Sequence, residues 1–430
     1  MKIAIIGGGL TGLSAAYQLS QKGHRVTIFE KEKFLGGLAY GFKKPTWKWH
    51  LEAAYHHLFT NDMAILGLIK ELGLQEKLII TRPITATLFK DKQYQLDSPL
   101  SLFQFPALSI VDKFRTALLL GILKINPFWR PLESVTAEQL CISIGGINAF
   151  NTIWKPLLYG KFSHFASTIS AAWLCARIKK RTPSLYYIKG GFHTLVTALE
   201  HAITKNRGVI LTSTTITSIR KSTNIKSANL QITLDNNTHS SFDKVLLTIP
   251  TSLAAKIVSN LSFAIGHLPL QIPHLHAQVL ILETDTPILQ KTYWLNVTDQ
   301  SYPFLAVVTH TNFMDKRYYG GKHITYIGNY LPNNHPYLKL SKEQLLKKFL
   351  PFIKRLSPEF RQLSIVNCQL FVAPFAQPVH QRHYSQKIPA IKTPVQNVYL
   401  ANMDSIVPWD RGTNYAVELG IKATNIILSS

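Results

Sequence analysis

Three glycines near the start of the chain have a spacing that suits the binding of a pyrophosphate. They are Gly7, Gly9 and Gly12, and they follow directly after the apolar run Lys2–Ile6. In a turn of this kind the first glycine makes the tight bend, the second lets a pyrophosphate approach the backbone, and the third lets a helix pack closely on a strand. A helix that begins at the turn presents unpaired N–H groups to the phosphates. The pattern therefore predicts a dinucleotide site.

The residues around this turn predict the strand, helix and strand that such a site requires. Lys2–Ile6 has the composition of a buried parallel strand, Leu13–Leu19 has apolar residues at helical spacing, and His24–Phe29 is rich in β-branched and aromatic residues. Glu30 ends the second strand, where a carboxylate accepts hydrogen bonds from ribose hydroxyls. The coincidence of all four features favours a nucleotide site over an ordinary glycine-rich turn.

Two adjacent histidines, His56 and His57, are the first candidates for catalysis. A neutral imidazole can accept a proton or orient a substrate near neutral pH. Adjacent side chains on a strand point to opposite faces, so the pair is unsuited to a shared zinc ion and only one ring would face the reacting group. No metal site is expected. The structural alternative, one packed histidine and one surface histidine, stays open.

The chain is long enough for several interleaved lobes. An α/β pattern at both ends and in the middle is interrupted by apolar helical runs such as Ser109–Leu123 and Thr136–Leu158, and Ser341 is a possible N-cap for a helix ending near Leu356. We expect an α/β fold in which a Rossmann-type domain is interleaved with a mixed β-sheet substrate domain and a helical insertion lobe. The predicted boundaries give a nucleotide-binding domain of residues 1–98, 186–260 and 386–430, a helical lobe of residues 99–185 that faces substrate or membrane, and a mixed-sheet domain of residues 261–385.

The composition is that of a globular and strongly basic protein. Hydrophobic residues make up 46% of the chain, which excludes intrinsic disorder, and 47 Lys and Arg against 23 Asp and Glu give a net charge of +24. Such a charge attracts anionic lipid, nucleic acid or anionic substrates. No nucleic-acid-binding motif accompanies it, whereas basic residues flank the apolar helices of the expected lobe, which suits an anionic membrane surface. These basic residues are Lys113, Arg115, Lys124, Lys179, Lys180 and Arg181.

The compartment is predicted from what the sequence lacks. Its three cysteines, Cys141, Cys175 and Cys368, form no paired motif, and neither a signal peptide nor a membrane-spanning segment is recognisable. We therefore expect a cytoplasmic protein, either free or peripheral at the inner face of the membrane.

Several further segments resemble the FAD-dependent amine-oxidase superfamily, which includes amine oxidases, protoporphyrinogen oxidases and phytoene desaturases. They are Glu30–Gly37, Tyr187–Leu195, Val398–Asp404 and Arg411–Gly420. Within that superfamily, Glu52–Asp62, Trp154–Phe162 and Ala171–Arg177 look most like bacterial protoporphyrinogen-oxidase-like proteins. The resemblance implies FAD as the cofactor.

The resemblance also implies where the cofactor is held. Ile216 would lie against the adenine, and the ribityl contact would come from Asn402 or Asp404, because Ala401–Asp404 departs from the usual Ala-Gly-Asp. Arg411 would stabilise negative charge at the flavin, or alternatively pair with a carboxylate as a loop residue. The full set of implied cofactor-binding residues is Gly7, Gly9, Leu10, Thr11, Gly12, Glu30, Lys31, Gly36, Gly37, Leu38, Ile216, Asn402, Asp404, Asn414 and Tyr415.

These residues predict an FAD-dependent oxidoreductase that takes a hydride from a C–N or C–C bond of an apolar small molecule. His56, His57 and Arg411 are its candidate catalytic residues. A second Gly-x-Gly-x-x-Gly motif is absent from the sequence, so a separate NAD(P)H domain is not expected and the electron acceptor stays open. Aromatic residues of the helical lobe either line an apolar channel or belong to its core: Trp154, Tyr159, Phe162 and Trp173.

Two alternatives remain open. One is a redox-neutral flavin enzyme, an isomerase or a sugar-nucleotide mutase whose anionic substrate is attracted by the basic charge. The other is a flavin-binding assembly or membrane-associated protein whose catalysis has been lost.

Overall fold

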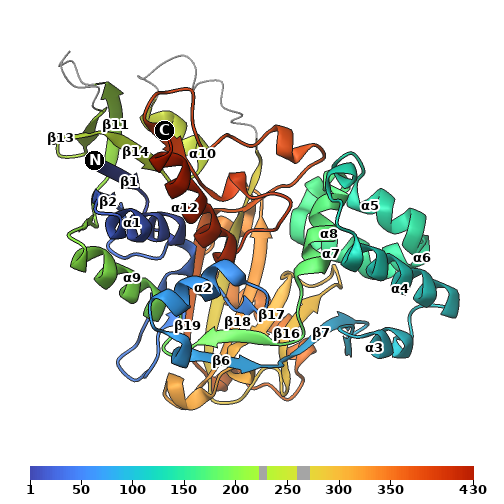
Figure 1. Ribbon diagram of the computed structural model, residues 1–430. Coiled ribbons are helices and arrows are strands. Elements are labelled where there is room, and N and C mark those ends of the chain that lie inside the picture. The colour runs from blue at the N-terminus through green and yellow to red at the C-terminus, as the bar shows by residue number, and fades with distance from the viewer. Residues whose placement is uncertain (222–229, 259–271) are drawn as a thin grey trace.

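A five-stranded parallel sheet joins segments from the start, the middle and the end of the chain (Figure 1). The computed structural model describes residues 1–221, 230–258 and 272–430. All neighbouring strands of the sheet are parallel, as in a doubly wound nucleotide-binding fold. Their order across the sheet is β10 (Val209–Leu211), β2 (Arg25–Phe29), β1 (Lys2–Ile6), β14 (Lys244–Leu247) and β20 (Val398–Leu400).

The two faces of this sheet are covered by different structures, because successive side chains of a strand alternate between the faces. Ile3 and Ile5 of β1 pack against helices, whereas Ala4 and Ile6 pack against an antiparallel meander. The helices are α1 (Leu10–Gln21), α9 (His193–Lys205) and α12 (Thr413–Leu428), and the meander consists of β11 (Ile216–Lys221), β12 (Leu230–Leu234) and β13 (His239–Phe242). The short helix α10 (Thr251–Ile257) follows β14 on the meander side.

A seven-stranded mixed sheet forms the second large layer. Its strand pairs are antiparallel except for the parallel pair β16 and β7. Helix α11 (Lys342–Leu356) covers its outer face with Leu345, Phe349 and Ile353, and Ser341 caps that helix as predicted. The strand order is β19 (Ile365–Pro378), β15 (His274–Thr284), β18 (His323–Leu331), β17 (Ala306–Thr309), β16 (Thr292–Val297), β7 (Ile84–Phe89) and β8 (Lys92–Gln95).

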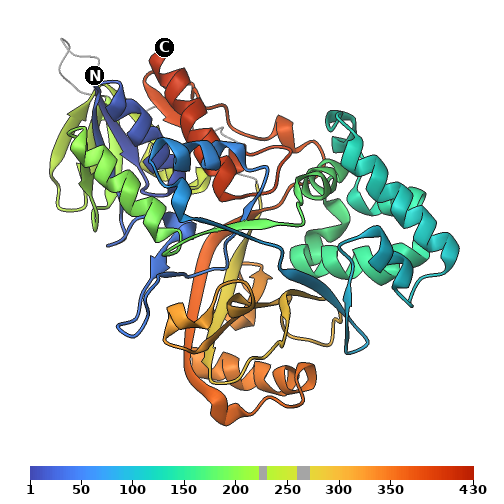
Figure 2. The same cartoon turned by 60° about the horizontal axis from the view of Figure 1, so that its bottom comes forward.

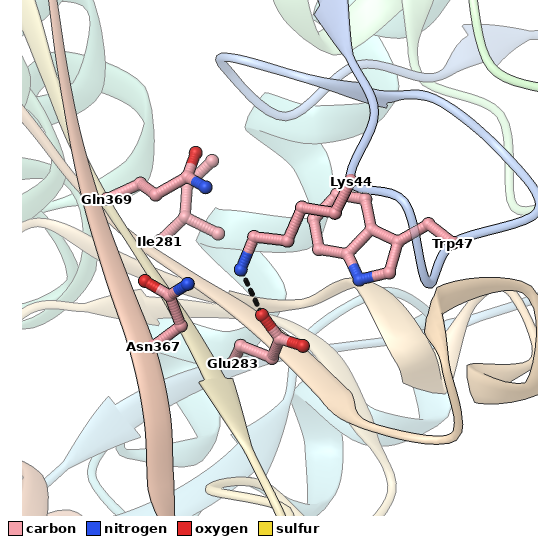
Figure 3. A pocket seen from close by; sticks show the side chains of 6 residues that line it. All are labelled: Lys44, Trp47, Ile281, Glu283, Asn367 and Gln369. Carbon is pink, nitrogen blue, oxygen red and sulfur yellow. Dashed lines mark hydrogen bonds and ion pairs between the residues drawn. The ribbon is translucent and has the colours of Figure 1, made fainter.

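An ion pair ties the loop after β3 (Gly41–Phe42) to this mixed sheet. Figure 3 shows Lys44 reaching from that loop to Glu283 of β15, beside the indole of Trp47. The hollow around the pair has a volume of about 10 Å³, which is room for at most one water molecule. This contact therefore fastens the loop to the sheet and is not a substrate site.

The helical lobe lies at one end of the molecule, away from the parallel sheet (Figures 1 and 2). It has its own apolar core, which includes Leu119, Phe150, Phe162 and Trp173. The aromatic residues Trp154, Phe162 and Trp173 are thus core residues of the lobe. The helices of the lobe are α3 (Pro99–Gln104), α4 (Ile110–Ile125), α5 (Ala137–Leu140), α6 (Ile147–Ala149), α7 (Lys155–Phe162) and α8 (Ala171–Lys180).

One predicted helix of this lobe is wrong. The run Thr136–Leu158 is broken at Gly146, whose φ of +91° belongs to a conformation that side-chain-bearing residues rarely adopt. Wider π-helical turns, Cys141–Gly145 and Phe150–Trp154, lie on either side of the break. The apolar periodicity is that of a helix, but the glycine pair Gly145 and Gly146 interrupts it.

Short strands connect the layers. One pair is β3 with β4 (Leu51–Glu52), and a three-stranded sheet is formed by β5 (Leu58–Phe59), β9 (Leu185–Ile188) and β6 (Leu78–Thr81). Helix α2 (Met63–Glu71) packs on α12. The predicted fold class is confirmed: a parallel α/β domain interleaved with a mixed sheet and a helical lobe. The predicted boundary between residues 260 and 261 lies outside the described residues.

Glu52 joins several of these elements from a fully buried position. Its carboxylate accepts hydrogen bonds from the Tyr187 hydroxyl at 2.8 Å and from the backbone N–H of Phe192 at 2.7 Å. These bonds connect β4 to β9 and to the start of α9. Burial raises the pKa of Glu52 to about 7, although the two hydrogen bonds oppose that rise.

We predict that Glu52→Gln changes the pH dependence of stability. The folded protein holds a proton on Glu52 between pH 4.5 and about 7, which the unfolded chain releases. The wild type should therefore lose up to about 3 kcal/mol relative to the variant as the pH rises through this range. Urea unfolding of both proteins at pH 5 and pH 8 measures the difference. Glu76→Gln at an exposed position is the control, and an equal difference at both pH values would contradict the prediction.

Candidate active site

Two glycine-containing turns lie backbone to backbone at the carboxyl end of β1. The N–H of Gly36 donates to the carbonyl of Gly8 at 2.9 Å, and Gly9 forms a bridge with Gly36. A Cβ atom built on Gly9 would point into open space, its nearest neighbour being the Cα atom of Gly37 at 3.9 Å. The turn therefore leaves a cradle walled by bare backbone at the start of α1.

This cradle fits a pyrophosphate. Helix α1 begins at Gly9 without a side-chain cap and without an acidic residue in its first turn, so the N–H groups of Leu10 and Thr11 face no competing carboxylate. Gly7 has a φ of +112°, and a side chain on Gly12 would collide with the Gly7 carbonyl. Both glycines are thus required by the fold, whereas Gly9 is required only by what enters the cradle.

Glu30 lies beside this cradle and is already hydrogen bonded to it. One carboxylate oxygen accepts from the N–H of Gly8 at 2.7 Å, and the other accepts from the N–H of Glu32 at 2.9 Å. The segment leading to Ile216 runs alongside, since the N–H of Thr214 donates to the carbonyl of Glu30 at 2.9 Å. Glu30, predicted to bind the ribose, therefore lies next to the segment that carries Ile216, predicted to contact the adenine.

Two other residues predicted to bind the cofactor, Lys31 and Leu38, follow Glu30 in the sequence. Lys31 is exposed and pairs only with its neighbour Glu32 among the described residues. Leu38 is half-buried in the turn that follows Gly36 and Gly37. Roles for these two in binding remain predictions.

The closing strand brings Asn402 and Asp404 to the same sheet edge, but their side chains already have partners. Asn402 donates to the carbonyl of Ile249 at 2.8 Å. Asp404 accepts from the Thr251 hydroxyl at 2.6 Å and contacts Nε2 of His274 at 2.6 Å. Burial opposes ionisation of Asp404, but the bonds from His274 and Thr251 hold its pKa below the ordinary value. Which of the two residues contacts a ribityl chain stays open.

Asn414 and Tyr415 take different positions at the start of α12. The Asn414 side-chain oxygen accepts from the N–H groups of Ala64 and Ile65, at 3.0 and 3.2 Å, and so caps helix α2. Tyr415 stacks on Trp409, and its buried hydroxyl has no hydrogen-bond partner among the described residues. Such an orphaned polar atom suits a site that takes a polar ligand.

His56 and His57 lie between β4 and β5, outside any strand, and both are half-buried. Neither is a surface histidine, in contrast to the structural alternative. Nδ1 of His56 contacts the Ala54 carbonyl at 2.7 Å, and Nδ1 of His57 contacts the Tyr293 hydroxyl at 3.1 Å. Burial lowers the pKa of His56 to about 4 and that of His57 to about 3. Both rings are therefore neutral at physiological pH.

Arg411 belongs to a charged cluster that the sequence did not reveal. Asp410 accepts from Nζ of Lys161 at 2.7 Å and from Nη1 of Arg177 at 2.8 Å. Arg411 donates from Nε to Gln377 at 2.9 Å and contacts the Tyr330 hydroxyl. We name Lys161, Arg177, Asp410 and Arg411 the basic cluster.

The basic cluster and the histidines form one region. Burial opposes ionisation of Asp410, but the three cations hold its pKa well below the usual range. The positive charge of Arg411 also disfavours protonation of His56, and that of Arg177 disfavours protonation of His57. The three predicted catalytic residues are thus brought together. The only signal in the sequence for Lys161 and Arg177 is that they are basic residues within Trp154–Phe162 and Ala171–Arg177, two segments that resemble the superfamily.

Comparisons with known proteins show the family of the chain. A family model described as flavin containing amine oxidoreductase matches residues 10–428. A zeta-carotene desaturase of Solanum lycopersicum is 28% identical over 181 residues, a segment covering 37% of this chain and 31% of the relative. The chain therefore matches only about a third of the length of that relative.

Two solved structures are similar along the whole chain. One is named as a protoporphyrinogen oxidase from Exiguobacterium sp. 255-15, at 17% identity, with a TM-score of 0.79 and coverage of 100% of this chain and 99% of that one. The other is a reduced UDP-galactopyranose mutase, at 14% identity, with a TM-score of 0.78 and coverage of 100% and 95%. At these identities the likeness is one of fold.

We predict that Gly9→Val abolishes retention of FAD while the protein still folds. The valine side chain would occupy the open cradle, where it meets no protein atom closer than 3.9 Å at Cβ. Flavin content of the purified protein and its circular dichroism measure the two effects. Gly67→Val, on the exposed side of α2 with no atom within 4 Å of its Cβ, is the matched control and should keep its flavin. Stoichiometric FAD in Gly9→Val would refute the assignment of the cradle.

Proposed function

Because the chain belongs to the flavin-containing amine oxidoreductases, it is a flavin-dependent oxidoreductase with FAD as its cofactor, and we propose that it removes a hydride from a C–N or C–C bond of an apolar small molecule. The observation that carries the proposal is the position of the basic cluster beside the start of α12, a helix that packs on α1, together with the two neutral histidines whose protonation Arg411 and Arg177 disfavour. When bound, FAD supplies the ring that accepts the hydride.

The residues of this chain would divide the remaining work. The N–H groups at the start of α1 and the carboxylate of Glu30 bind the nucleotide. Arg411 supplies a fixed positive charge beside the start of α12. His56 and His57, being neutral, can accept a proton from a substrate or orient it through a free ring nitrogen.

Anaerobic reduction of the bound flavin tests the proposal. The purified protein should be yellow, and its visible flavin absorbance should bleach when a substrate is found among amines, porphyrinogens and polyenes. A protein that is colourless and gains no flavin on reconstitution would refute it. Turnover by pre-reduced protein alone, without net consumption of electrons, would instead favour the redox-neutral isomerase or mutase alternative.

We predict that the two histidines act in their neutral forms. Since their pKa values are about 4 and about 3, neither should produce an inflection in the rate of flavin reduction between pH 5 and pH 8. His56→Gln or His57→Gln should slow that rate about 10²-fold if the ring transfers a proton. His164→Gln, at an exposed position of the helical lobe, is the control. Unchanged rates in both variants would favour a flavin-binding protein without catalysis by this pair.

An exposed apolar stripe on α4 supports a membrane-facing position for the helical lobe. Its side chains are Ile110, Val111, Phe114, Leu118 and Ile125, which are between 58% and 78% exposed and recur at helical spacing. Soluble surfaces rarely carry so continuous an apolar patch. Helix α4 lies at the far end of the molecule from the parallel sheet (Figures 1 and 2).

The charge near this stripe fits an anionic lipid surface. Lys113, Arg115 and Lys124 are on the same helix, and their side chains donate to backbone carbonyls of neighbouring segments, which fixes the charges in place. In the described part of the chain, every helix falls short of the length and apolar character needed to cross a bilayer. We therefore infer that α4 lies on the membrane in the plane of the headgroups.

We predict that the double variant Phe114→Asp and Leu118→Asp weakens binding to vesicles containing phosphatidylglycerol at least tenfold, because two large apolar side chains are lost from the lipid-facing stripe. Co-sedimentation with the vesicles measures the binding. Met63→Asp replaces an apolar side chain that is 72% exposed on α2, away from the stripe, and should leave binding unchanged. Equal binding by all three proteins, or dimers that dissociate in the double variant, would contradict the membrane assignment.

A further inference from the structure

We propose that the basic cluster is a subsite for an anionic oxygen group of the substrate, a carboxylate or a phosphate. The inference rests on the proposed function, because the subsite adjoins the histidines assigned to the reacting part of the substrate. It adds a chemical requirement that the proposed function lacks: the substrate is an amphiphile with an apolar body and an anionic end.

The first argument is an imbalance of charge. Three basic side chains, Lys161, Arg177 and Arg411, surround the single carboxylate of Asp410, which leaves an excess of two positive charges when Lys161 is protonated and of one when it is neutral. Lys161 and Asp410 are only 11% and 12% exposed. Among the described residues, no other carboxylate pairs with these cations. Charges removed from water are costly unless they are paired, so the excess calls for an anion.

The second argument is a surplus of hydrogen-bond donors. A guanidinium has five N–H donors and an ammonium has three. Among the described residues, the side chain of Arg177 donates only from Nη1 and that of Lys161 donates once, in both cases to Asp410. Arg411 uses Nε and Nη2, for Gln377 and Tyr330. These groups have donors left for an oxygen ligand.

A buried donor beside the cluster is also unsatisfied. The indole N–H of Trp173 has no partner among the described residues, although the residue is only 4% exposed. The ring of Trp173 lies 5.0 Å from Nζ of Lys161 and 5.8 Å from the guanidinium carbon of Arg177. Buried donors of native proteins nearly always have a partner, so this N–H is available to a polar ligand bound beside the cluster.

The surroundings suit an amphiphile more than a free ion. Aromatic rings of Phe162, Trp173 and Tyr330 lie within 5.5 Å of Nζ of Lys161, so an apolar wall adjoins the charged group. Arg177 is the most accessible member, its side chain being 37% exposed. An anionic end would thus enter along Arg177, with the half-buried ring of Tyr330 as the accessible apolar surface for the body of the substrate.

The ionisation of Lys161 suits a site that binds an anion. Burial, with a smaller contribution from the neighbouring charges of Arg177 and Arg411, lowers its pKa to about 7, although Asp410 opposes the change. A bound anion would stabilise the protonated form through the same electrostatics that Asp410 now supplies alone.

The test measures binding to the FAD-loaded protein by calorimetry and by tryptophan fluorescence. The probes are decanoate, decyl phosphate and decanol, used below their micelle concentrations, together with inorganic phosphate. We expect decanoate or decyl phosphate to bind at least tenfold more tightly than decanol, and inorganic phosphate to bind weakly. If inorganic phosphate alone bound tightly, the proposal of an amphiphilic substrate would be refuted, and the cluster would be a site for a free anion.

Variants locate the binding. Arg177→Gln changes the most accessible cation and should preserve the fold, and Lys161→Met changes the most buried one. Each variant should bind decanoate or decyl phosphate at least tenfold more weakly than the wild type does and should bind decanol with unchanged affinity. Arg115→Gln, which removes a lobe arginine bonded to carbonyls outside the cluster, is the control. Unchanged affinities in Arg177→Gln, with circular dichroism intact, would refute the subsite even if Lys161→Met fails to fold.

The outcome separates this inference from the proposed function. If the anionic probes bind as expected but no substrate reduces the flavin, the subsite stands and the oxidoreductase proposal fails. If a neutral amine or polyene reduces the flavin and the anionic probes bind no better than decanol, the oxidoreductase proposal stands and the subsite fails.

Discussion

The close approach of two backbones is the constraint on which the rest of this structure depends. Gly37 can lie this close to Gly9 only because Gly37 has no side chain, since a Cβ atom there would come within 3.1 Å of the Gly9 Cα atom, and the bare backbone keeps the start of α1 open. Gly420 repeats the principle on the other side of α1, where a side chain would collide with Ser14 of that helix. Helix α1 is thus held between two glycine contacts. The second contact, at Gly420, belongs to α12, and the N-terminal end of α12 lies beside the basic cluster.

A second constraint is the cost of burying charge. Asp410, Lys161 and Arg177 come from three different elements and meet in a region that is largely removed from water. Burying one carboxylate among three cations makes sense if function requires a positive site, because stability alone would be served better by apolar residues. The same desolvation keeps His56 and His57 neutral. One region therefore combines the basic cluster, whose two arginines stay charged, with two histidines that stay neutral.

Local sequence patterns predicted the fold well. The features that they did not predict depend on contacts between residues far apart in the sequence. The segment from β1 to Glu30 and the capped helix α11 depend on neighbouring residues, so their spacing sufficed. The basic cluster joins Lys161 to Asp410 across 249 positions, and no local pattern records that contact. Asn414 was assigned to the cofactor, yet its oxygen caps α2, a partner that only the tertiary fold supplies. The broken helix at Gly146 shows that a periodicity can persist through a turn.

The interleaving of the parallel sheet bears on how the protein is made. Its strands come from residues near positions 2, 25, 209, 244 and 398, so the edge strand β20 leaves the ribosome long after the glycine turn has been synthesised. Contacts of such large sequence separation form late and slowly. Capture of the flavin is therefore expected after translation, and the emerging glycine turn must remain unaggregated until the final strand arrives.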